Sequence, residues 1–341
     1  MTGFKGKTIL INDGTGSFGG YFVNYLLDKK FKEVRVFSRD ELKQEEMRLR
    51  LENSAIGFYV RDGRDRDSVD DVMAGVDYVF HAAALKQVPT CEFFPMQATQ
   101  TNVVGSQNII NSAISHGVSK VISLSTDKAV YPVNALGITK ALMEKVVQST
   151  SRKLFQGQTI LSLVRYGNVL FSRGSVIPLF LKQIREKKPI TVTEYEMTRF
   201  LLPLKEAIQL VGFALQNGRQ GDIFVCNAPS ANIGDLAQAL KNIFSSDSEI
   251  KIMGIRHGEK LHETLVSKEE LLRSEDMGGY LRLSMDDRDL NYKKYLSEGD
   301  KKVIQTEDYT SQNTTRLTVP KIEEMLLAQP EIIAELKNQE L

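Results

Sequence analysis

Residues 8–19 read TILINDGTGSFG, a short apolar run that leads into a cluster of glycines, and this stretch decides the fold. The run Thr8–Asn12 is typical of a strand that is buried on both faces of a parallel sheet. Residues 17–29 then carry apolar side chains at helical spacing, so the glycines connect a strand to a helix. Such a turn presents backbone N–H groups and the positive end of a helix to a pyrophosphate; the alternative is a tight turn without a ligand. The cofactor-binding residues assigned to the turn are Gly16, Ser17, Phe18 and Gly19.

Strands and helices alternate outward from this stretch through residue 166. Strands are expected at 8–12, 34–37, 56–59, 77–81, 120–125 and 159–166. Helices are expected at 17–29, 40–51, 68–73, 95–116 and 135–149. Short connections between apolar strands predict an α/β fold of the Rossmann-like, doubly wound kind, with helices on both faces of a parallel sheet. Sheets of this kind bind ligands beyond the carboxyl ends of their strands.

The alternation weakens after residue 167. Helices are expected at 178–185, 204–215, 233–244, 319–327 and 331–337, and strands at 222–226 and 250–255. We therefore expect a nucleotide-binding domain over residues 1–167, to which some later segments return. Residues 168–341 are expected to form mainly a smaller, mixed α/β substrate-binding cap. The polar stretch 286–315 is expected to fold over the cleft or to pack against a partner subunit.

The charge of the chain is balanced. The 341 residues include 44 Lys and Arg against 43 Asp and Glu, a net charge of +1. This balance gives no global attraction to nucleic acid or to an anionic membrane. No apolar run approaches the ~20 residues that a membrane-spanning helix needs. We therefore expect neither a nucleic-acid partner nor membrane insertion.

Cysteine and histidine are sparse. Cys91 and Cys226 lie far apart in the sequence, which fits free thiols in a reducing compartment. The first residues lack the layout of a signal peptide, so we expect a cytoplasmic protein. The histidines show no ligand spacing apart from the weak pair His257 and His262, so no metal site is expected.

The end of the second strand bears on the choice of cofactor. NAD-specific folds place an acidic residue there to hold the ribose hydroxyls. This chain has Ser38 and Arg39 instead, and a hydroxyl with a guanidinium favours the 2′-phosphate of NADP. Lys43, one helical turn further on, adds a positive charge. The alternative is that Arg39 is only a solvated charge at the entry of a helix.

Residues after the third and fourth strands complete the expected NADP site. Asp62 is placed to accept a hydrogen bond from the adenine amine. Ala82 and Ala83 are small residues where the backbone of the cofactor must pass. His81, beside them, is expected to have a structural role.

Seven long strings occur in order along the chain. They are FSRDE (Phe37–Glu41), DYVFHAAALKQVP (Asp77–Pro89), STDKAVYP (Ser125–Pro132), RYGNV (Arg165–Val169), SRGSVIPLF (Ser172–Phe180), MTRF (Met197–Phe200) and RHGEKLHETL (Arg256–Leu265). In these strings the chain resembles the UDP-N-acetylglucosamine 4,6-dehydratases of bacterial surface-polysaccharide synthesis. These enzymes belong to the extended short-chain dehydrogenase/reductase superfamily. The likeness is greatest to the inverting 4,6-dehydratase/5-epimerases of capsule and O-antigen pathways, whose relatives are often labelled UDP-glucose 4-epimerases. It covers nearly the whole chain, including RDLNY at residues 288–292.

The resemblance implies a reaction in three parts. A hydride passes from C4 of the UDP-sugar to NADP, water is lost across C5 and C6, and the hydride returns to C6. Reprotonation of C5 from the other face gives the epimerised product. NADP is regenerated in each turnover and is expected to stay bound, and the chain is expected to assemble as a homo-oligomer, a dimer or a hexamer.

The catalytic pair implied by the resemblance follows the fifth strand. Asp127 is the acid that protonates the departing C6 hydroxyl, and Lys128 is the base that takes the C5 proton. Burial must then favour the neutral forms of both groups. The alternative for such a pair is a solvated salt bridge. Ser125 and Thr126 are expected to hold the sugar 4-hydroxyl or the nicotinamide region.

Two positions depart from the pattern of the superfamily. Short-chain dehydrogenases usually carry YxxxK, in which the lysine lowers the pKa of the tyrosine and holds the nicotinamide ribose. Lys140 is present here and is expected to be a catalytic and cofactor-binding residue, while Leu136 takes the place of the tyrosine. Another base is therefore needed for the C4 hydroxyl, and Asp127 or Lys128 is nominated. Asp13 takes the place of the first glycine of GxxGxxG, where a carboxylate beside a pyrophosphate is unfavourable. Its backbone must also tolerate the conformation that the glycine supplied.

The resemblance also implies six further substrate-binding residues, and the chemistry is compatible, since guanidinium groups suit a diphosphate and carboxylates suit a diol. They are Lys86, Asn168, Arg173, Arg199, Arg256 and Glu259. Two other functions stay open: a UDP-sugar 4-epimerase, and a homologue that binds NADP and UDP-sugar but has lost turnover. Leu136 argues against the epimerase, while Asp13 and Leu136 are the arguments for lost turnover.

Overall fold

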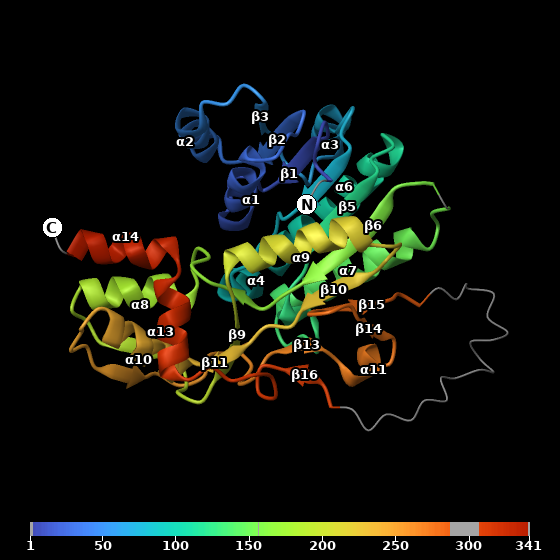
Figure 1. Cartoon of the computed structure of the whole chain (residues 1–341). Coiled ribbons are helices and arrows are strands. Elements are labelled where there is room, and N and C mark those ends of the chain that lie inside the picture. Colours follow the sequence, from blue (N-terminus) through green and yellow to red (C-terminus); the bar gives the residue numbers. More distant parts are fainter. Residues whose placement is uncertain (1–2, 156, 287–306, 340–341) are drawn as a thin grey trace, which may run out of the picture.

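The computed structural model describes residues 3–155, 157–286 and 307–339, and its centre is a nine-stranded sheet within these ranges (Figure 1). The strands of the sheet are β1 (Thr8–Asn12), β2 (Glu33–Ser38), β3 (Ile56–Val60), β4 (Tyr78–His81), β5 (Lys120–Leu124), β6 (Ile160–Arg165), β10 (Ile223–Cys226), β14 (Ser274–Asp276) and β15 (Tyr280–Leu283). Their order is β14-β15-β10-β6-β5-β4-β1-β2-β3. The strands from β3 to β10 are parallel, and β15 and β14 are antiparallel at one edge. The predicted Rossmann-like fold is confirmed.

Helices cover both faces of this sheet. They are α1 (Ser17–Leu27), α2 (Glu41–Leu51), α3 (Arg66–Met73), α4 (Val88–Phe93), α5 (Pro95–Thr99), α6 (Gly105–Ser115), α7 (Ala135–Ser151) and α9 (Leu204–Asn217). Helices α1 and α9 contact each other over one face, and α3, α6 and α7 form a contacting row over the other. Every residue of β1 is buried because both of its faces are covered, which explains its unbroken apolar run.

A second hydrophobic core lies outside the sheet. It is built by α8 (Val176–Arg185), α10 (Ile233–Ile243), α13 (Val319–Leu327) and α14 (Pro330–Gln339), which gather on one side of the molecule in Figure 1. Small sheets join it: β7 (Asn168–Val169), β9 (Thr198–Leu202) and β11 (Ser230–Asn232), and the pair β8 (Ile190–Val192) with β12 (Ile250–Ile252). We call this unit the cap. A further pair, β13 (Thr264–Val266) with β16 (Tyr309–Thr310), and helix α11 (Lys268–Leu271) lie beneath the main sheet in Figure 1.

The expected helix over residues 95–116 is confirmed, because the backbone is helical without a break from residue 95 to residue 115, but it contains a π-helical turn that was not predicted. The segment consists of α5, a π-helical turn η1 (Gln100–Val104) and α6, and α4 precedes it unpredicted. Prolines at the first turns of α4 and α5 start two separate helices, and the π-helical turn shifts the register of the last. The strands expected at 222–226 and 250–255 are present as β10 and β12. The other short strands after residue 167 were not predicted, because two to five residues carry too little periodicity. The string RDLNY lies outside the described residues.

A buried ion-pair network ties the sheet to two other elements. The Arg165 guanidinium, at the end of β6, is 1% exposed and hydrogen-bonds Glu144 of α7 at 2.7 and 3.0 Å. It also bonds Glu270 of α11 at 2.8 and 3.0 Å and the Leu265 carbonyl at 2.8 Å. Burial opposes the charge, but the two carboxylates outweigh it, and the pKa of Arg165 is raised. The charge is therefore fully compensated inside the fold.

We expect Arg165→Met to lower the free energy of unfolding by about 3–5 kcal/mol, because it leaves buried carboxylates without their cation. Urea unfolding measures the change. Arg185→Met is the control, since Arg185 is exposed and lies 3.6 Å from Glu335, and it should cost less than about 1 kcal/mol. A loss at Arg165 no larger than at Arg185 would contradict the structural role of the network.

Candidate functional site

A cavity of about 980 Å³ lies between the carboxyl ends of the parallel strands and the cap. This volume is at the upper end of the range of roughly 300–1,000 Å³ that ligand sites span. Most residues predicted from the sequence line it. They are Gly16, Ser17, Phe18, Ser38, Arg39, Lys43, Asp62, Ala82, Ala83, Lys86, Ser125, Thr126, Lys128, Lys140, Asn168, Arg173, Arg199, Arg256 and Glu259. Two predicted residues, Gly19 and Asp127, lie behind the cavity wall.

The glycine turn has the shape of a phosphate cradle. Gly16 caps α1, so the free N–H groups of the first helical turn face the cavity. Gly19 packs against the turn itself, because a Cβ there would lie 2.2 Å from the Asp13 carbonyl oxygen. The turn therefore fits the pyrophosphate of a dinucleotide in its backbone geometry.

Asp13 fits the same ligand less well. Its φ of +63° is left-handed, the conformation that a glycine adopts without strain. Burial raises the pKa of its carboxyl to about 6, against the opposing effects of Lys86, Lys43, Arg173 and Arg39. The carboxylate also lies against the turn, where a Cβ on the capping glycine would be 2.4 Å from its Oδ2. A negative charge therefore stands beside the cradle at neutral pH.

The end of β2 presents a positive charge to the cavity. The Ser38 hydroxyl hydrogen-bonds Thr15 at 2.9 Å and so ties β2 to the glycine turn. The Arg39 side chain is 53% exposed and lies on the cavity wall. Lys43 pairs with Asp40, which caps α2. Arg39 is thus the more available of the two predicted cations.

Asp62 is already engaged by arginine. Arg64 donates to both of its carboxylate oxygens at 2.7–3.1 Å, and Arg39 lies 3.7 Å away. Ala82 and Ala83 line the wall opposite. Both ring nitrogens of His81 are hydrogen-bonded, and burial lowers its pKa to about 3, so the imidazole is neutral and held in place.

The candidate catalytic pair begins a 3-10 turn, η2 (Asp127–Ala129), directly after β5. Lys128 Nζ lies 3.0 Å from Asp127 Oδ1, and Asp127 is wholly buried. Thr126 also donates to Asp127, at 2.8 Å. Ser125 donates to Glu144 at 2.5 Å, which links this strand end to the Arg165 network. Lys128 is therefore the member of the pair that faces the cavity.

The charge state of Lys128 differs from the expectation. Burial alone lowers the pKa of its ammonium, but Asp127 and Glu263 raise it by more, so the net shift is upward. The expectation that burial would make this amine neutral is wrong in the substrate-free molecule. A carboxylate on either side of the ammonium outweighs the lost solvation.

Leu136 and Lys140 lie one turn apart on α7, both on the cavity wall. Leu136 is buried in a small apolar cluster with Cys91 and Ala98. Lys140 donates to the Leu124 carbonyl at 2.6 Å, and burial lowers its pKa to about 8. The position of the usual phenol is therefore dry and carries no exchangeable proton.

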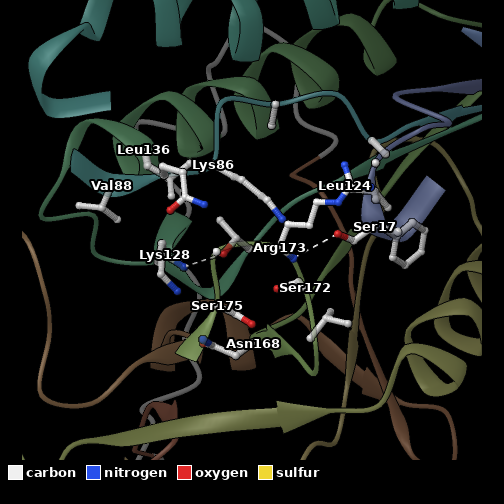
Figure 2. Close-up of a pocket in the computed structure, with 18 of the residues that line it drawn as sticks. Ser17, Lys86, Val88, Leu124, Lys128, Leu136, Asn168, Ser172, Arg173 and Ser175 are labelled. Atoms are coloured by element: carbon white, nitrogen blue, oxygen red, sulfur yellow. Dashed lines mark hydrogen bonds between the residues drawn. The ribbon is translucent and has the colours of Figure 1, made fainter. Parts of the chain in front are cut away.

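The cap side of the cavity is polar. The backbone N–H of Arg173 donates to Ser17 Oγ at 3.1 Å, which brings the cap loop onto the glycine turn (Figure 2). In the described part of the chain, Asn168 Oδ1, Ser175 Oγ and Glu259 Oε2 are buried without a hydrogen-bond partner. Unsatisfied buried oxygens in a cavity wall are suited to a hydroxyl-rich ligand.

Two residues of the RHGEKLHETL string were not singled out from the sequence. Glu263 is 2% exposed and lines the cavity beside Lys128. Lys260 lies 4.0 Å from Glu263 and donates to the Val130 carbonyl at 2.6 Å. Asn134, the cap of α7, holds the same loop by donating to the Gly258 carbonyl at 2.7 Å. The sequence of the string does not say which of its charged side chains point inward.

Residues 3–155, 157–286 and 307–339 contain neither a metal-binding cluster nor a membrane-spanning helix. No group of three or more His, Cys, Asp or Glu residues there could hold a metal ion. Within the same ranges, no helix combines the length and apolarity needed to cross a bilayer.

The doubly wound sheet, the phosphate cradle and the capped cavity define an enzyme fold of the extended short-chain dehydrogenase class. The chain matches the family described as "Polysaccharide biosynthesis protein" over residues 9–285, and "Polysaccharide biosynthesis protein C-terminal" over residues 286–332. It belongs to this family of polysaccharide biosynthesis proteins, which confirms the resemblance at that level.

Similar proteins were found among curated sequences and solved structures. The chain is 54% identical over 339 residues to a Rickettsia felis protein named UDP-glucose 4-epimerase, covering 98% of this chain and 99% of that one. It is similar to the structure of Pen from Bacillus thuringiensis, with 34% identity, a TM-score of 0.87, and coverage of 96% and 100%. A dTDP-glucose 4,6-dehydratase from Streptomyces venezuelae, solved with NAD, shares the fold at 21% identity and a TM-score of 0.68, covering 74% and 86%.

We expect Asp13→Asn to stabilise the protein more at about pH 8 than at about pH 5. The pKa of Asp13 in the folded protein, about 6, lies above its ordinary value of 3.8. As the pH rises through this interval, ionisation of Asp13 lowers the free energy of unfolding by up to about 3 kcal/mol, and the loss persists at higher pH. Asparagine lacks this charge and tolerates a left-handed backbone. Thermal unfolding at the two pH values measures the difference. Equal gains at both would show that the charge of Asp13 costs nothing.

Proposed function

We propose that the chain converts UDP-N-acetylglucosamine to a 4-keto-6-deoxy UDP-sugar with inversion at C5, as an NADP-dependent 4,6-dehydratase of bacterial surface-polysaccharide synthesis. The observation that carries this proposal is the Asp127–Lys128 pair. Lys128 lines the cavity while Leu136 fills the phenol position with a buried alkyl group. Water loss needs an acid and a base, and this pair can supply both.

The cavity has the residues for both ligands. The glycine turn and Arg39 would hold a dinucleotide with a 2′-phosphate, and Arg173 and Arg256 would meet the sugar diphosphate. Asn168 and Glu259 each offer an unsatisfied oxygen to ribose or sugar hydroxyls. When bound, the nicotinamide takes a hydride from C4 and returns it to C6.

The pair can work as acid and base without gaining or losing a proton. In the substrate-free molecule the shared proton is on Lys128, 3.0 Å from the Asp127 carboxylate. Its transfer to Asp127 leaves a neutral amine that can take the C5 proton. Because Asp127 lies behind the cavity wall, its acid proton would reach the C6 hydroxyl through the Thr126 hydroxyl, which bonds Asp127 at 2.8 Å and lines the cavity. Water then leaves with the electrons of the broken C5–H bond forming the C5–C6 double bond.

A UDP-sugar 4-epimerase is the second candidate, because the curated relatives at 54% identity carry that name. Both reactions begin by oxidising C4 and need a base for its hydroxyl, which neither the buried Leu136 nor Lys140, turned to the Leu124 carbonyl, supplies. Only the dehydratase also needs an acid for a leaving hydroxyl. The dehydratase is therefore favoured because it uses the Asp127–Lys128 pair as acid and base.

We expect the purified protein, given UDP-N-acetylglucosamine and catalytic NADP⁺, to form a product lighter by one water, detected by mass spectrometry. Lys128→Met should lower this rate by at least about 10²-fold, the low end for loss of an acid–base group. Lys182→Met, on an exposed part of α8, is the control and should leave the rate unchanged. A UDP-sugar of unchanged mass but altered C4 configuration would instead support the epimerase.

We expect Arg39 to determine whether the protein prefers NADP or NAD. We expect Arg39→Asp to weaken NADP⁺ binding by about 10–100-fold, the effect of losing a charged hydrogen bond to phosphate, and to change NAD⁺ binding far less. Titration calorimetry with each cofactor measures both affinities. Arg50→Asp, on an exposed position of α2, serves as the matched control. Equal weakening of both cofactors would reject a 2′-phosphate contact.

A further inference from the structure

Glu263 stands at the centre of a compact charged cluster. Its Oε1 lies 3.6 Å from Lys128 Nζ and 3.9 Å from Arg199 Nε, and its Oε2 lies 4.0 Å from Lys260 Nζ. Asp127 Oδ1 lies 3.0 Å from the same Lys128 Nζ. The cluster holds three basic side chains and two carboxylates, so its net charge depends on the proton of Lys128.

The position of Glu263 is fixed from behind. Its backbone N–H donates to Ser311 Oγ at 2.9 Å, and the Ser311 N–H donates to its carbonyl at 2.8 Å. Ser311 is itself buried and hydrogen-bonds Thr198, the residue before Arg199. The side chain of Glu263 therefore starts from a rigid backbone and reaches the cavity wall at a defined place.

The carboxylate of Glu263 is not held by the hydrogen bonds that usually accompany a buried structural carboxylate. In the part of the chain that the structure describes, its Oε2 is buried and has no hydrogen-bond partner. A buried carboxylate kept only for stability would normally be hydrogen-bonded through both oxygens. Its negative charge instead attracts the three cations within 4 Å of it. Of these cations, Lys128 is the one that also pairs with Asp127.

We propose that Glu263 is a positioning residue for the reaction: its carboxylate holds Lys128 at the cavity wall in the ammonium form, so that the acid–base pair keeps its single proton until substrate arrives. This inference rests on the proposed function for its catalytic meaning. Its physical content, the charge state of Lys128, can be tested without turnover.

The consequence is a defined pH dependence. The pair needs its shared proton, because without it Asp127 has nothing to give to the leaving hydroxyl. Removing the charge of Glu263 makes that proton easier to lose, while Arg199 and Lys260 remain to repel it. The charge therefore protects activity on the alkaline side.

The test compares Glu263→Gln with the unaltered protein. We expect the alkaline limb of kcat to move to lower pH by about one unit or more, the size expected for an opposite charge within ~4–6 Å. We also expect the ¹⁵N shift of the Lys128 side chain, assigned with Lys128→Gln, to change from ammonium to amine at correspondingly lower pH. Glu263→Asp retains the charge and should restore much of the difference.

Glu186→Gln is the matched control, because Glu186 pairs with Lys188 on the surface and should affect neither readout. The same Lys128 titration in Glu263→Gln and the unaltered protein would overturn the inference. If the unaltered protein forms no dehydrated product at all, the proposed function fails, but the ¹⁵N titration still decides the role of Glu263.

Discussion

The buried charge of Arg165 is the constraint around which the molecule is arranged. A guanidinium that is 1% exposed is tolerable only if carboxylates surround it, and these come from α7 and α11. The network therefore fixes the helix that carries Leu136 and Lys140 against the sheet. Through Glu144 the network also holds Ser125, which directly follows β5 and precedes Asp127 and Lys128 by a few residues. One compensated charge thus sets the relative positions of several walls of the cavity.

The same physical logic recurs in the cavity. Lys128 lies within 4 Å of the buried carboxylates of Asp127 and Glu263, and these two neighbours raise its pKa by more than burial lowers it. At the opposite end, Asp13 is placed in the cradle without a hydrogen-bonding network of this kind, and the pKa of its carboxyl is raised. The cluster around Glu263 pairs its cations with carboxylates, while the glycine turn carries an acidic group that opposes an anionic ligand.

The sequence predicted the fold well where periodicity was strong. The run Thr8–Asn12 and the glycines after it were sufficient for the parallel sheet, since a doubly buried strand needs unbroken apolar residues. The helix expected over residues 95–116 is present, although its apolar spacing does not reveal the π-helical turn inside it. Placement of side chains was harder: Lys128 was correctly put at the cavity, but Asp127 proved to lie behind the wall.

Glu263 shows why the remaining side chains of the cavity could not be predicted from the sequence. It lies 135 residues after Lys128, and the pairing of β13 with β16 and the hydrogen bonds of Ser311 turn it inward.

The most direct test of the account is the position of solvent deuterium in the product formed from UDP-N-acetylglucosamine in deuterium oxide. One deuterium at C5 with inverted configuration is the predicted result, because C5 is deprotonated and reprotonated from the other face. Turnover without deuterium at C5 would contradict it.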